Sequence, residues 1–255
     1  MSDRQIAADL AEARRSGRLT DPGEGWPPRD EAQAEAVRDA AFAALGERGA
    51  GYKIGATSPE AQQIIGCDGP FYGAMPASKV LASGDGFDMP DGTLGIECEF
   101  AFRIGRDQPA GTDGYDGASV AALVESCHPA LEVVGRRTRG TGFPPYLEAV
   151  GDMALNVAFV HGATIDGWEK LGLAETPVVG AVDGVEAKRG SGSLVLGNPL
   201  NALAWLANRL ARDGKALKTG DWVSTGTCLG VVPAAKGTEI SGIYGDFAKV
   251  TMRLR

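Results

Sequence analysis

Apolar residues recur at helical spacing in the first part of the chain. Between Asp3 and about Ser16, Ile6, Leu10 and Ala13 fall on one face of a helix. After a stretch rich in glycine and proline, a second helix, rich in alanine and charged residues, is predicted from Arg29 to Gly46. We therefore expect the first fifty residues to form a helical cap.

From residue 51 onward, short apolar runs separated by glycine and proline predict β-rich structure. Because these runs do not alternate regularly with helices, a doubly wound parallel sheet is not favoured. We predict an α+β fold with a mixed, curled sheet. The expected strands are Tyr52–Ile54, Leu94–Ile104, Ala130–Val134, Ala154–Val160, Leu194–Leu196, Trp222–Thr225 and Lys249–Leu254, and further helices are expected at Ser119–Ser126 and Pro199–Asp213.

Composition narrows the class of protein. A chain of 255 residues with 44% hydrophobic content can bury a large core, and we divide it into a cap region at 1–50 and a main domain at 51–255. A formal net charge of -8 argues against a nucleic acid or an anionic membrane as partner. The four cysteines are scattered without a Cys-x-x-Cys pair, and no apolar run reaches membrane-spanning length. We expect a soluble, cytoplasmic protein with reduced thiols.

Two acidic residues share one face of the predicted strand at 94–104. Because side chains alternate along a strand, Glu97 and Glu99 stand together, while Ile96, Cys98 and Phe100 occupy the opposite face. Adjacent carboxylates repel each other unless water screens them, one is protonated, or a cation lies between them. The strand is therefore either an amphipathic strand with solvated glutamates or part of a site for a hard divalent cation such as Mg²⁺.

Two further charged residues interrupt apolar runs. Glu132 lies in a run that resembles a buried strand, where a carboxylate needs a cationic partner, a proton or a metal ion. Arg136 or Arg137 is one possible partner. Lys53 lies between Tyr52 and a run of small and apolar residues; it points either to solvent or into a site, where an ammonium group can donate a proton or hold a substrate carboxylate.

Four motifs, in this order along the chain, resemble those of the 2-keto-4-pentenoate hydratases. They are Gly-Tyr-Lys-Ile-Gly-Ala-Thr-Ser at 51–58, Ile-Glu-Cys-Glu-Phe-Ala-Phe at 96–102, Pro-Ala-Leu-Glu-Val-Val at 129–134 and Leu-Gly-Asn-Pro-Leu-Asn-Ala-Leu-Ala-Trp-Leu-Ala at 196–207. These hydratases resemble the 4-oxalocrotonate decarboxylases, and both belong to the fumarylacetoacetate hydrolase superfamily. The resemblance spans nearly the whole chain.

The resemblance implies a mixed β-roll fold and a homo-oligomer. It also implies an Mg²⁺ or Mn²⁺ ion held by Glu97, Glu99 and Glu132, with Lys53 as the active-site lysine. The turn at 225–231 matches a substrate-lining segment, in which we expect Thr227 to contact the substrate. A 2-oxo acid can chelate such a cation through its carboxylate and 2-oxo oxygens, so that developing enolate charge is stabilised.

The sequence departs from the family pattern at two places. Phe71 stands where many hydratases carry an acid, in Gly-Pro-Phe-Tyr-Gly at 69–73. A family signature Asp-Asn-Ala-Ser-Ser is replaced by Asp-Met-Ala-Leu-Asn at 152–156, which introduces Met153 and Leu155. These changes either make the substrate pocket more apolar, favouring a hydrophobic acyl chain or a different reaction, or repack a wall.

The first functional hypothesis is a metal-dependent hydro-lyase that hydrates 2-hydroxy-2,4-dienoates to 4-hydroxy-2-oxo acids during aromatic-compound catabolism. A 2-oxo-acid decarboxylase of the 4-oxalocrotonate type, or an acylpyruvate C–C hydrolase, is the alternative that uses the same metal site. From a different class, a non-catalytic ligand-binding or partner subunit is the second alternative. In each case the ligand is a small 2-oxo acid.

Overall fold

The protein's structure is a computed structural model that describes residues 2–255, and its strands form two sheets. The strands are β1 Gly49–Gly55, β2 Phe71–Pro76, β3 Val80–Ala82, β4 Gly86–Phe87, β5 Thr93–Ile104, β6 Val124–Gly135, β7 Asn156–His161, β8 Pro177–Val182, β9 Val185–Ser191, β10 Trp222–Val232, β11 Glu239–Tyr244 and β12 Ala248–Leu254. The larger sheet has the order β2-β1-β10-β5-β6-β7-β3 and the smaller β4-β12-β11-β8-β9. Antiparallel neighbours predominate, but β1 runs parallel to β10. The predicted α+β class with mixed sheets is confirmed.

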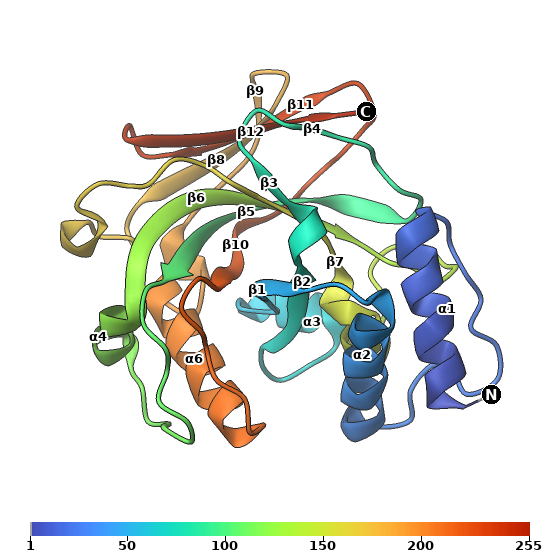
Figure 1. The fold of residues 1–255 in the computed structure, drawn as a ribbon. Coiled ribbons are helices and arrows are strands. Elements are labelled where there is room, and N and C mark those ends of the chain that lie inside the picture. The colour runs from blue at the N-terminus through green and yellow to red at the C-terminus, as the bar shows by residue number, and fades with distance from the viewer. Residues whose placement is uncertain (1) are drawn as a thin grey trace.

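Helices flank the larger sheet. The α-helices of the described residues are α1 Asp3–Ser16, α2 Glu31–Leu45, α3 Pro59–Ile65, α4 Gly117–Val120, α5 Tyr146–Gly151 and α6 Pro199–Arg212. Short 3₁₀ turns occupy 77–79, 121–123, 168–170 and 192–194. In Figure 1, α1 and α2 stand side by side at one end of the molecule, and α6 lies beneath the curved strands β5 and β6. The two predicted N-terminal helices and the predicted helix at 199–213 are therefore present.

The long strands β5 and β6 separate an apolar layer from a polar one. Ile96, Cys98 and Phe100 are fully buried. They belong to the main hydrophobic core, and a Cβ placed on Gly180 of β8 would lie 3.5 Å from the Cys98 sulfur, so the smaller sheet covers this face. Because side chains alternate, the intervening glutamates point to the opposite face of β5. The predicted alternation thus places the acids on the face away from the smaller sheet.

Two predicted elements differ in the structure. The expected strand at Leu194–Leu196 is a 3₁₀ turn followed by loop, in which Val195 is fully buried. Burial of a short apolar run does not distinguish a strand from a turn. The expected helix at Ser119–Ser126 ends as α4 at Val120, and Val124 begins β6, where pairing with β5 outweighs the local helical pattern.

A left-handed turn precedes β7. Met153, Ala154 and Leu155 have φ values of 50°, 53° and 60°, so the predicted strand at Ala154–Val160 begins only at Asn156. Non-glycine residues rarely adopt this conformation, which costs about 1–2 kcal/mol per residue. Three such residues in succession therefore require strong anchoring at both ends of the turn.

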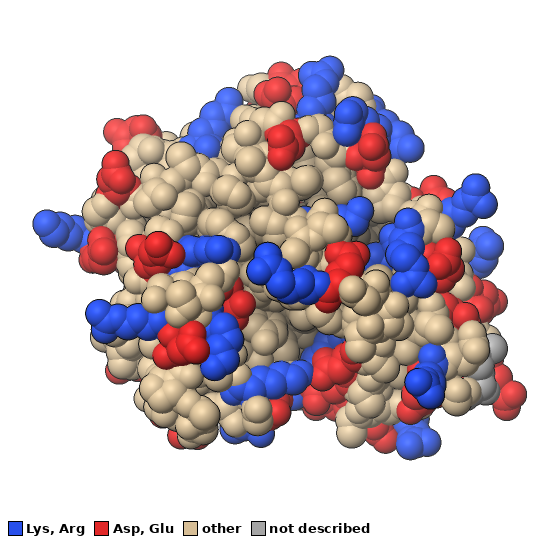
Figure 2. All heavy atoms as spheres, viewed as in Figure 1, with Lys and Arg blue, Asp and Glu red and all other residues tan. Residues whose placement is uncertain are grey.

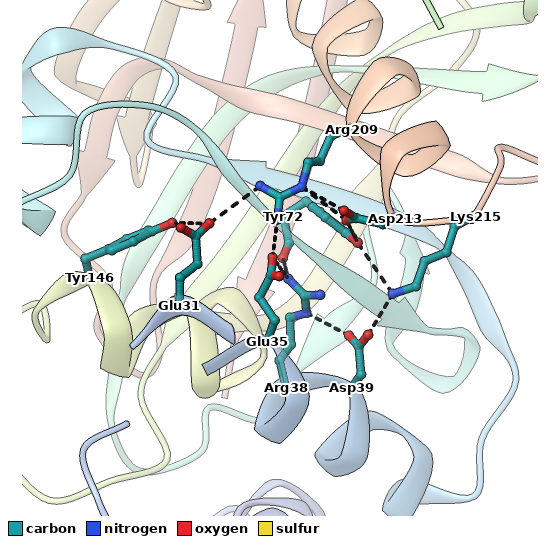
Figure 3. Close-up of polar contacts among 9 residues, drawn as sticks. All are labelled: Glu31, Glu35, Arg38, Asp39, Tyr72, Tyr146, Arg209, Asp213 and Lys215. Carbon is teal, nitrogen blue, oxygen red and sulfur yellow. Dashed lines mark hydrogen bonds and ion pairs between the residues drawn. The ribbon is translucent and has the colours of Figure 1, made fainter. Parts of the chain in front are cut away.

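A polar bridge joins α2 to α6 across the sheet edge (Figure 3). The Tyr72 hydroxyl on β2 donates a hydrogen bond of 2.7 Å to Asp213, which also accepts from Arg209 of α6 at 3.1 Å. Arg209 in turn pairs with Glu35 of α2. Half-buried ion pairs contribute little individually, but they fix the relative orientation of the elements they join. The full bridge comprises Glu31, Glu35, Arg38, Asp39, Tyr72, Tyr146, Arg209, Asp213 and Lys215 (Figure 3).

Charges of both signs are interspersed over the face shown in Figure 2, without a large field of basic residues. Nucleic-acid binding needs a concentrated basic surface, and the exclusion of nucleic acid as a partner stays a prediction. None of the helices formed by residues 2–255 has the length and apolar character needed to cross a membrane.

Candidate metal centre

The three predicted glutamates converge in space. Glu97 and Glu99 lie on the same face of β5, and Glu132 lies directly opposite Glu97 on the neighbouring strand β6. One carboxylate oxygen from each residue can be chosen so that the three oxygens all lie within 4.8 Å of one another. Oxygen atoms at this spacing can share one small divalent cation.

Two of these glutamates each have one oxygen fixed by the protein. Oε2 of Glu99 accepts hydrogen bonds from the Ser224 hydroxyl at 2.5 Å and the Gly226 amide at 2.8 Å. Oε1 of Glu132 accepts from the side-chain amide of Asn156 at 2.8 Å. Within residues 2–255, Oε1 of Glu99 and Oε2 of Glu132 are buried without a hydrogen-bond partner. Such buried oxygens are costly unless an ion or a proton satisfies them, so the donor set fits a hard cation such as Mg²⁺ or Mn²⁺.

Lys53 approaches the same group of acids from β1. Its side chain is buried, and Nζ forms an ion pair with Oε2 of Glu132 at 3.0 Å. Burial disfavours the charged ammonium, but the carboxylates of Glu132, Glu97 and Glu99 outweigh this effect and raise the pKa of Lys53. Lys53 is therefore a cation inside the site, and the solvent-exposed alternative is excluded.

Glu97 and Glu99 resist ionisation in the absence of a cation. Burial raises the pKa of Glu97 to about 7, an effect that the ammonium of Lys53 opposes and the carboxylate of Glu132 reinforces. Burial, together with the other two carboxylates, raises the pKa of Glu99 well above its usual value. Three ionised acids and one ammonium would leave two uncompensated negative charges. A divalent cation neutralises both, which is a second reason why the site fits one.

Neither arginine proposed as a partner contacts Glu132. Arg137 pairs with Asp152, its Nε lying 2.5 Å from Oδ1, and the ion pair of Arg136 is with Glu148 at 3.7 Å. The carboxylate of Glu132, in the apolar run of β6, is therefore paired with the Lys53 ammonium and accepts a hydrogen bond from Asn156.

A cavity of about 400 Å³ opens beside the acids. Lys53 and Glu97 line its polar part, and Phe71 and Leu155 belong to an apolar wall that also includes Phe143. The structure thus places Phe71 and Leu155 in the cavity wall. Met153 is different because it packs in the cluster of apolar residues between α1 and α2, which fits the second alternative, repacking, for this residue.

Thr227 also lines the cavity, on β10 opposite Glu99. Its hydroxyl donates a hydrogen bond of 2.9 Å to the Gly230 carbonyl, which holds the turn in shape. The predicted contact between Thr227 and substrate stays a prediction.

The sequence patterns did not identify three other residues near the site. Asn156 and Ser224 hold the glutamates, and Lys188 on β9 lines the cavity. Ser224 and Asn156 are polar residues inside apolar strands, and this feature of the sequence could have identified them. Lys188 gave none, because β9 is a largely exposed strand.

Comparison with known proteins agrees with this geometry. Residues 56–253 match the family model for the fumarylacetoacetate (FAA) hydrolase C-terminal region. A 2-keto-4-pentenoate hydratase of Burkholderia vietnamiensis is 36% identical over 249 residues, covering 94% of this chain and 93% of the relative. A 4-oxalocrotonate decarboxylase of a Pseudomonas species is 29% identical over 219 residues, covering 82% and 79%.

The fold is also similar to a solved structure over its whole length. The 4-oxalocrotonate decarboxylase from Pseudomonas putida G7, complexed with magnesium and adipate, superposes with a TM-score of 0.86 at 24% identity, covering 100% of this chain and 99% of that one. Because the family model spans the segment that carries Glu97, Glu99 and Glu132, and relatives match almost end to end, the chain belongs to the fumarylacetoacetate hydrolase family.

Proposed function

We propose that the protein is a divalent-metal-dependent hydro-lyase that hydrates 2-hydroxy-2,4-dienoates of the 2-keto-4-pentenoate type to 4-hydroxy-2-oxo acids. The observation that carries this proposal is the convergence of Glu97, Glu99 and Glu132 on one point, where, within the part of the chain that the structure describes, Oε1 of Glu99 has no hydrogen-bond partner and Oε2 of Glu132 faces only the Lys53 ammonium. The relatives named 2-keto-4-pentenoate hydratase, which match over 94% of the chain, support the substrate class.

Glu97, Glu99 and Glu132 would hold Mg²⁺ or Mn²⁺, which when bound supplies Lewis-acid polarisation of a chelating 2-oxo acid. Lys53 keeps a proton at Nζ, beside the acids and at the edge of the cavity. Hydration requires a proton to leave the 2-hydroxyl group, another to reach carbon, and water to add to the conjugated ketone. Lys53 is placed to pair with the substrate carboxylate or to move one of these protons.

The cavity wall indicates the character of the rest of the substrate. Phe71, Leu155 and Phe143 present apolar surface, and Arg189, the cation next to Lys188, is engaged by Glu186 with Nε 3.0 Å from Oε1. A second carboxylate on the substrate that did not reach Lys188 would therefore meet mostly hydrocarbon, which penalises a charge. The preferred substrate has one carboxylate and an apolar tail.

Turnover of three 2-hydroxydienoates in the presence of Mg²⁺ tests the proposed function. The compounds are 2-hydroxypenta-2,4-dienoate, a homologue with an alkyl tail, and a dicarboxylate analogue. We expect loss of dienol absorbance without release of carbon dioxide, and a kcat/KM about tenfold higher for the alkyl homologue than for the dicarboxylate. Absence of turnover with all three, together with thermal stabilisation by the ligands, would instead indicate a binding subunit.

Decarboxylation is the second candidate, because one relative over 82% of the chain is named 4-oxalocrotonate decarboxylase. The same metal site can accept the electron pair released when carbon dioxide leaves. Release of carbon dioxide from the dicarboxylate, at a rate exceeding hydration of the monocarboxylates, would favour this candidate and would contradict the preference for an apolar tail.

Replacement of Lys188 by glutamine is expected to raise KM for the monocarboxylate substrate about tenfold while changing kcat little. Lys188 lines the cavity, and no carboxylate within residues 2–255 forms an ion pair with it, so its charge is available to an incoming anion. Steady-state kinetics at low and high salt give the measurement, because salt screens the charge of Lys188 and should reduce the difference in KM between the wild type and the variant. Lys249→Gln, which removes an exposed lysine from β12, is the matched control. An unchanged KM in Lys188→Gln would show that this ammonium does not attract the substrate.

A further inference from the structure

A buried polar chain connects the N-terminal helix α1 to Glu132. Arg14 of α1 extends into the main domain, where Nη2 donates to Oδ1 of Asn156 at 3.0 Å and to the Val157 carbonyl at 3.1 Å. Its Nη1 donates to the Asn156 carbonyl. Arg14 therefore holds both the side chain and the main chain of Asn156, and Asn156 is fully buried.

The contact with Arg14 determines which way the Asn156 amide faces. A guanidinium group can only donate, so the amide oxygen must face Arg14 and the NH₂ group must face Glu132. Nδ2 then donates to Oε1 of Glu132 at 2.8 Å. The reversed amide would place two donors together at Arg14 and two acceptors together at Glu132. With Oε1 fixed in this way, Oε2 of Glu132 is left facing Lys53.

The backbone before Asn156 is held by a second buried arginine. The main-chain amide of Arg137 donates to Asp152 at 2.7 Å, and its guanidinium donates to the Asn156 carbonyl at 2.6 Å. These contacts fasten both ends of the left-handed turn formed by residues 153–155. A strained turn held at both ends delivers the next side chain to one defined position, and here that side chain is Asn156.

We propose that Asn156 and Arg14 are positioning residues of the metal centre, and that α1 is consequently part of that centre. This inference rests on the proposed binding of a divalent cation by Glu97, Glu99 and Glu132. Asn156 fixes one oxygen of Glu132 so that the other is preoriented toward the cation, and Arg14 fixes Asn156. Groups that orient metal ligands typically change metal affinity by about 10–100-fold when they are removed.

Substitution of Asn156 by alanine is therefore expected to weaken Mg²⁺ binding at least about tenfold, as measured by titration calorimetry on the full chain without substrate. Leu210→Ala is the matched control, because it removes a fully buried apolar side chain from α6, outside the α1–Asn156–Glu132 chain. That variant should lower the melting temperature and leave the Mg²⁺ dissociation constant unchanged. A merely structural role for Asn156 would give the same pattern as Leu210→Ala and would overturn the proposal.

Two further variants separate the possible outcomes. Arg14→Lys keeps the positive charge but lacks the planar fork whose two nitrogens reach the side chain and the main chain of Asn156, so we expect a smaller loss of Mg²⁺ affinity. This variant serves as the test if Asn156→Ala does not fold. Wild-type affinity in a folded Arg14→Lys protein would contradict the role of Arg14. Glu132→Gln should lose Mg²⁺ binding outright. If Glu132→Gln bound Mg²⁺ normally, the assignment of the metal site itself would be wrong. If Glu132→Gln lost Mg²⁺ binding while Asn156→Ala bound Mg²⁺ normally, only the positioning role would be overturned.

Discussion

Substitution of Glu97 by glutamine is expected to reduce metal-dependent turnover at least about a hundredfold. At pH values above 7, it should also give the metal-free protein a higher melting temperature than that of the wild type. The first effect follows from the loss of one ligand oxygen. The second follows from the raised pKa of Glu97, about 7, which burial produces. A group whose pKa is raised by folding contributes stability below its unfolded value, and this stability is lost as the pH rises through the folded pKa. Glutamine never ionises, so the loss is avoided.

Melting temperatures measured without metal from pH 5 to pH 8 provide the test, alongside turnover with Mg²⁺. Wild-type protein should lose stability over this range relative to Glu97→Gln, and addition of Mg²⁺ should stabilise the wild type more at pH 8 than at pH 5. Glu125→Gln is the control, because Glu125 is an exposed acid on the same strand as Glu132. Full turnover in Glu97→Gln would show that Glu97 is not a ligand.

Substitution of Lys53 by methionine is expected to lower kcat about 10²–10⁴-fold and to tighten Mg²⁺ binding. Nζ of Lys53 lies 3.0 Å from Oε2 of Glu132, the oxygen that we assign to the cation, so ammonium and metal compete for the same negative charge. Removing the ammonium removes that competition, while the substrate loses its partner or proton carrier. Opposite changes in catalysis and metal affinity distinguish Lys53 from a metal ligand, for which both should fall.

Titration calorimetry with Mg²⁺ and steady-state kinetics on the same preparation measure both effects. The variant should be purified with Mg²⁺ present, because the three neighbouring acids repel one another more strongly without Lys53. If Lys53→Met turned over substrate at the wild-type rate, the catalytic assignment would be wrong. If its Mg²⁺ affinity fell, Lys53 would be holding the acids together and would not compete with the metal.

Strand periodicity and one anomaly predicted the separate acids of the site, and the family resemblance implied that they converge. Alternation along residues 94–104 places Glu97 and Glu99 on one face, and a charge in the apolar run around Glu132 requires a partner. The structure adds that Glu97 and Glu132 pair directly across β5 and β6. The cross-strand register depends on the whole sheet, so no local pattern contains it.

The residues that orient the site were not predictable in the same way. Asn156 acts through a left-handed turn of three non-glycine residues, which tertiary anchoring maintains against local preference. Arg14 looks like an ordinary basic residue near the end of an amphipathic helix, and only the docking of α1 buries it. The side chains of β9 from Val185 to Arg189 are all exposed, so this strand lacks the apolar alternation that identifies strands.

A crystal grown with Mn²⁺ and measured by anomalous scattering tests most directly whether three glutamates share one cation. We expect a single strong peak with an oxygen of Glu97, Glu99 and Glu132 each at about 2.1–2.3 Å, and with Asn156 still bound to the other oxygen of Glu132. A map without a peak among these carboxylates, in which each acid is protonated or held by its own protein partner, would contradict the metal centre and the hydro-lyase chemistry derived from it.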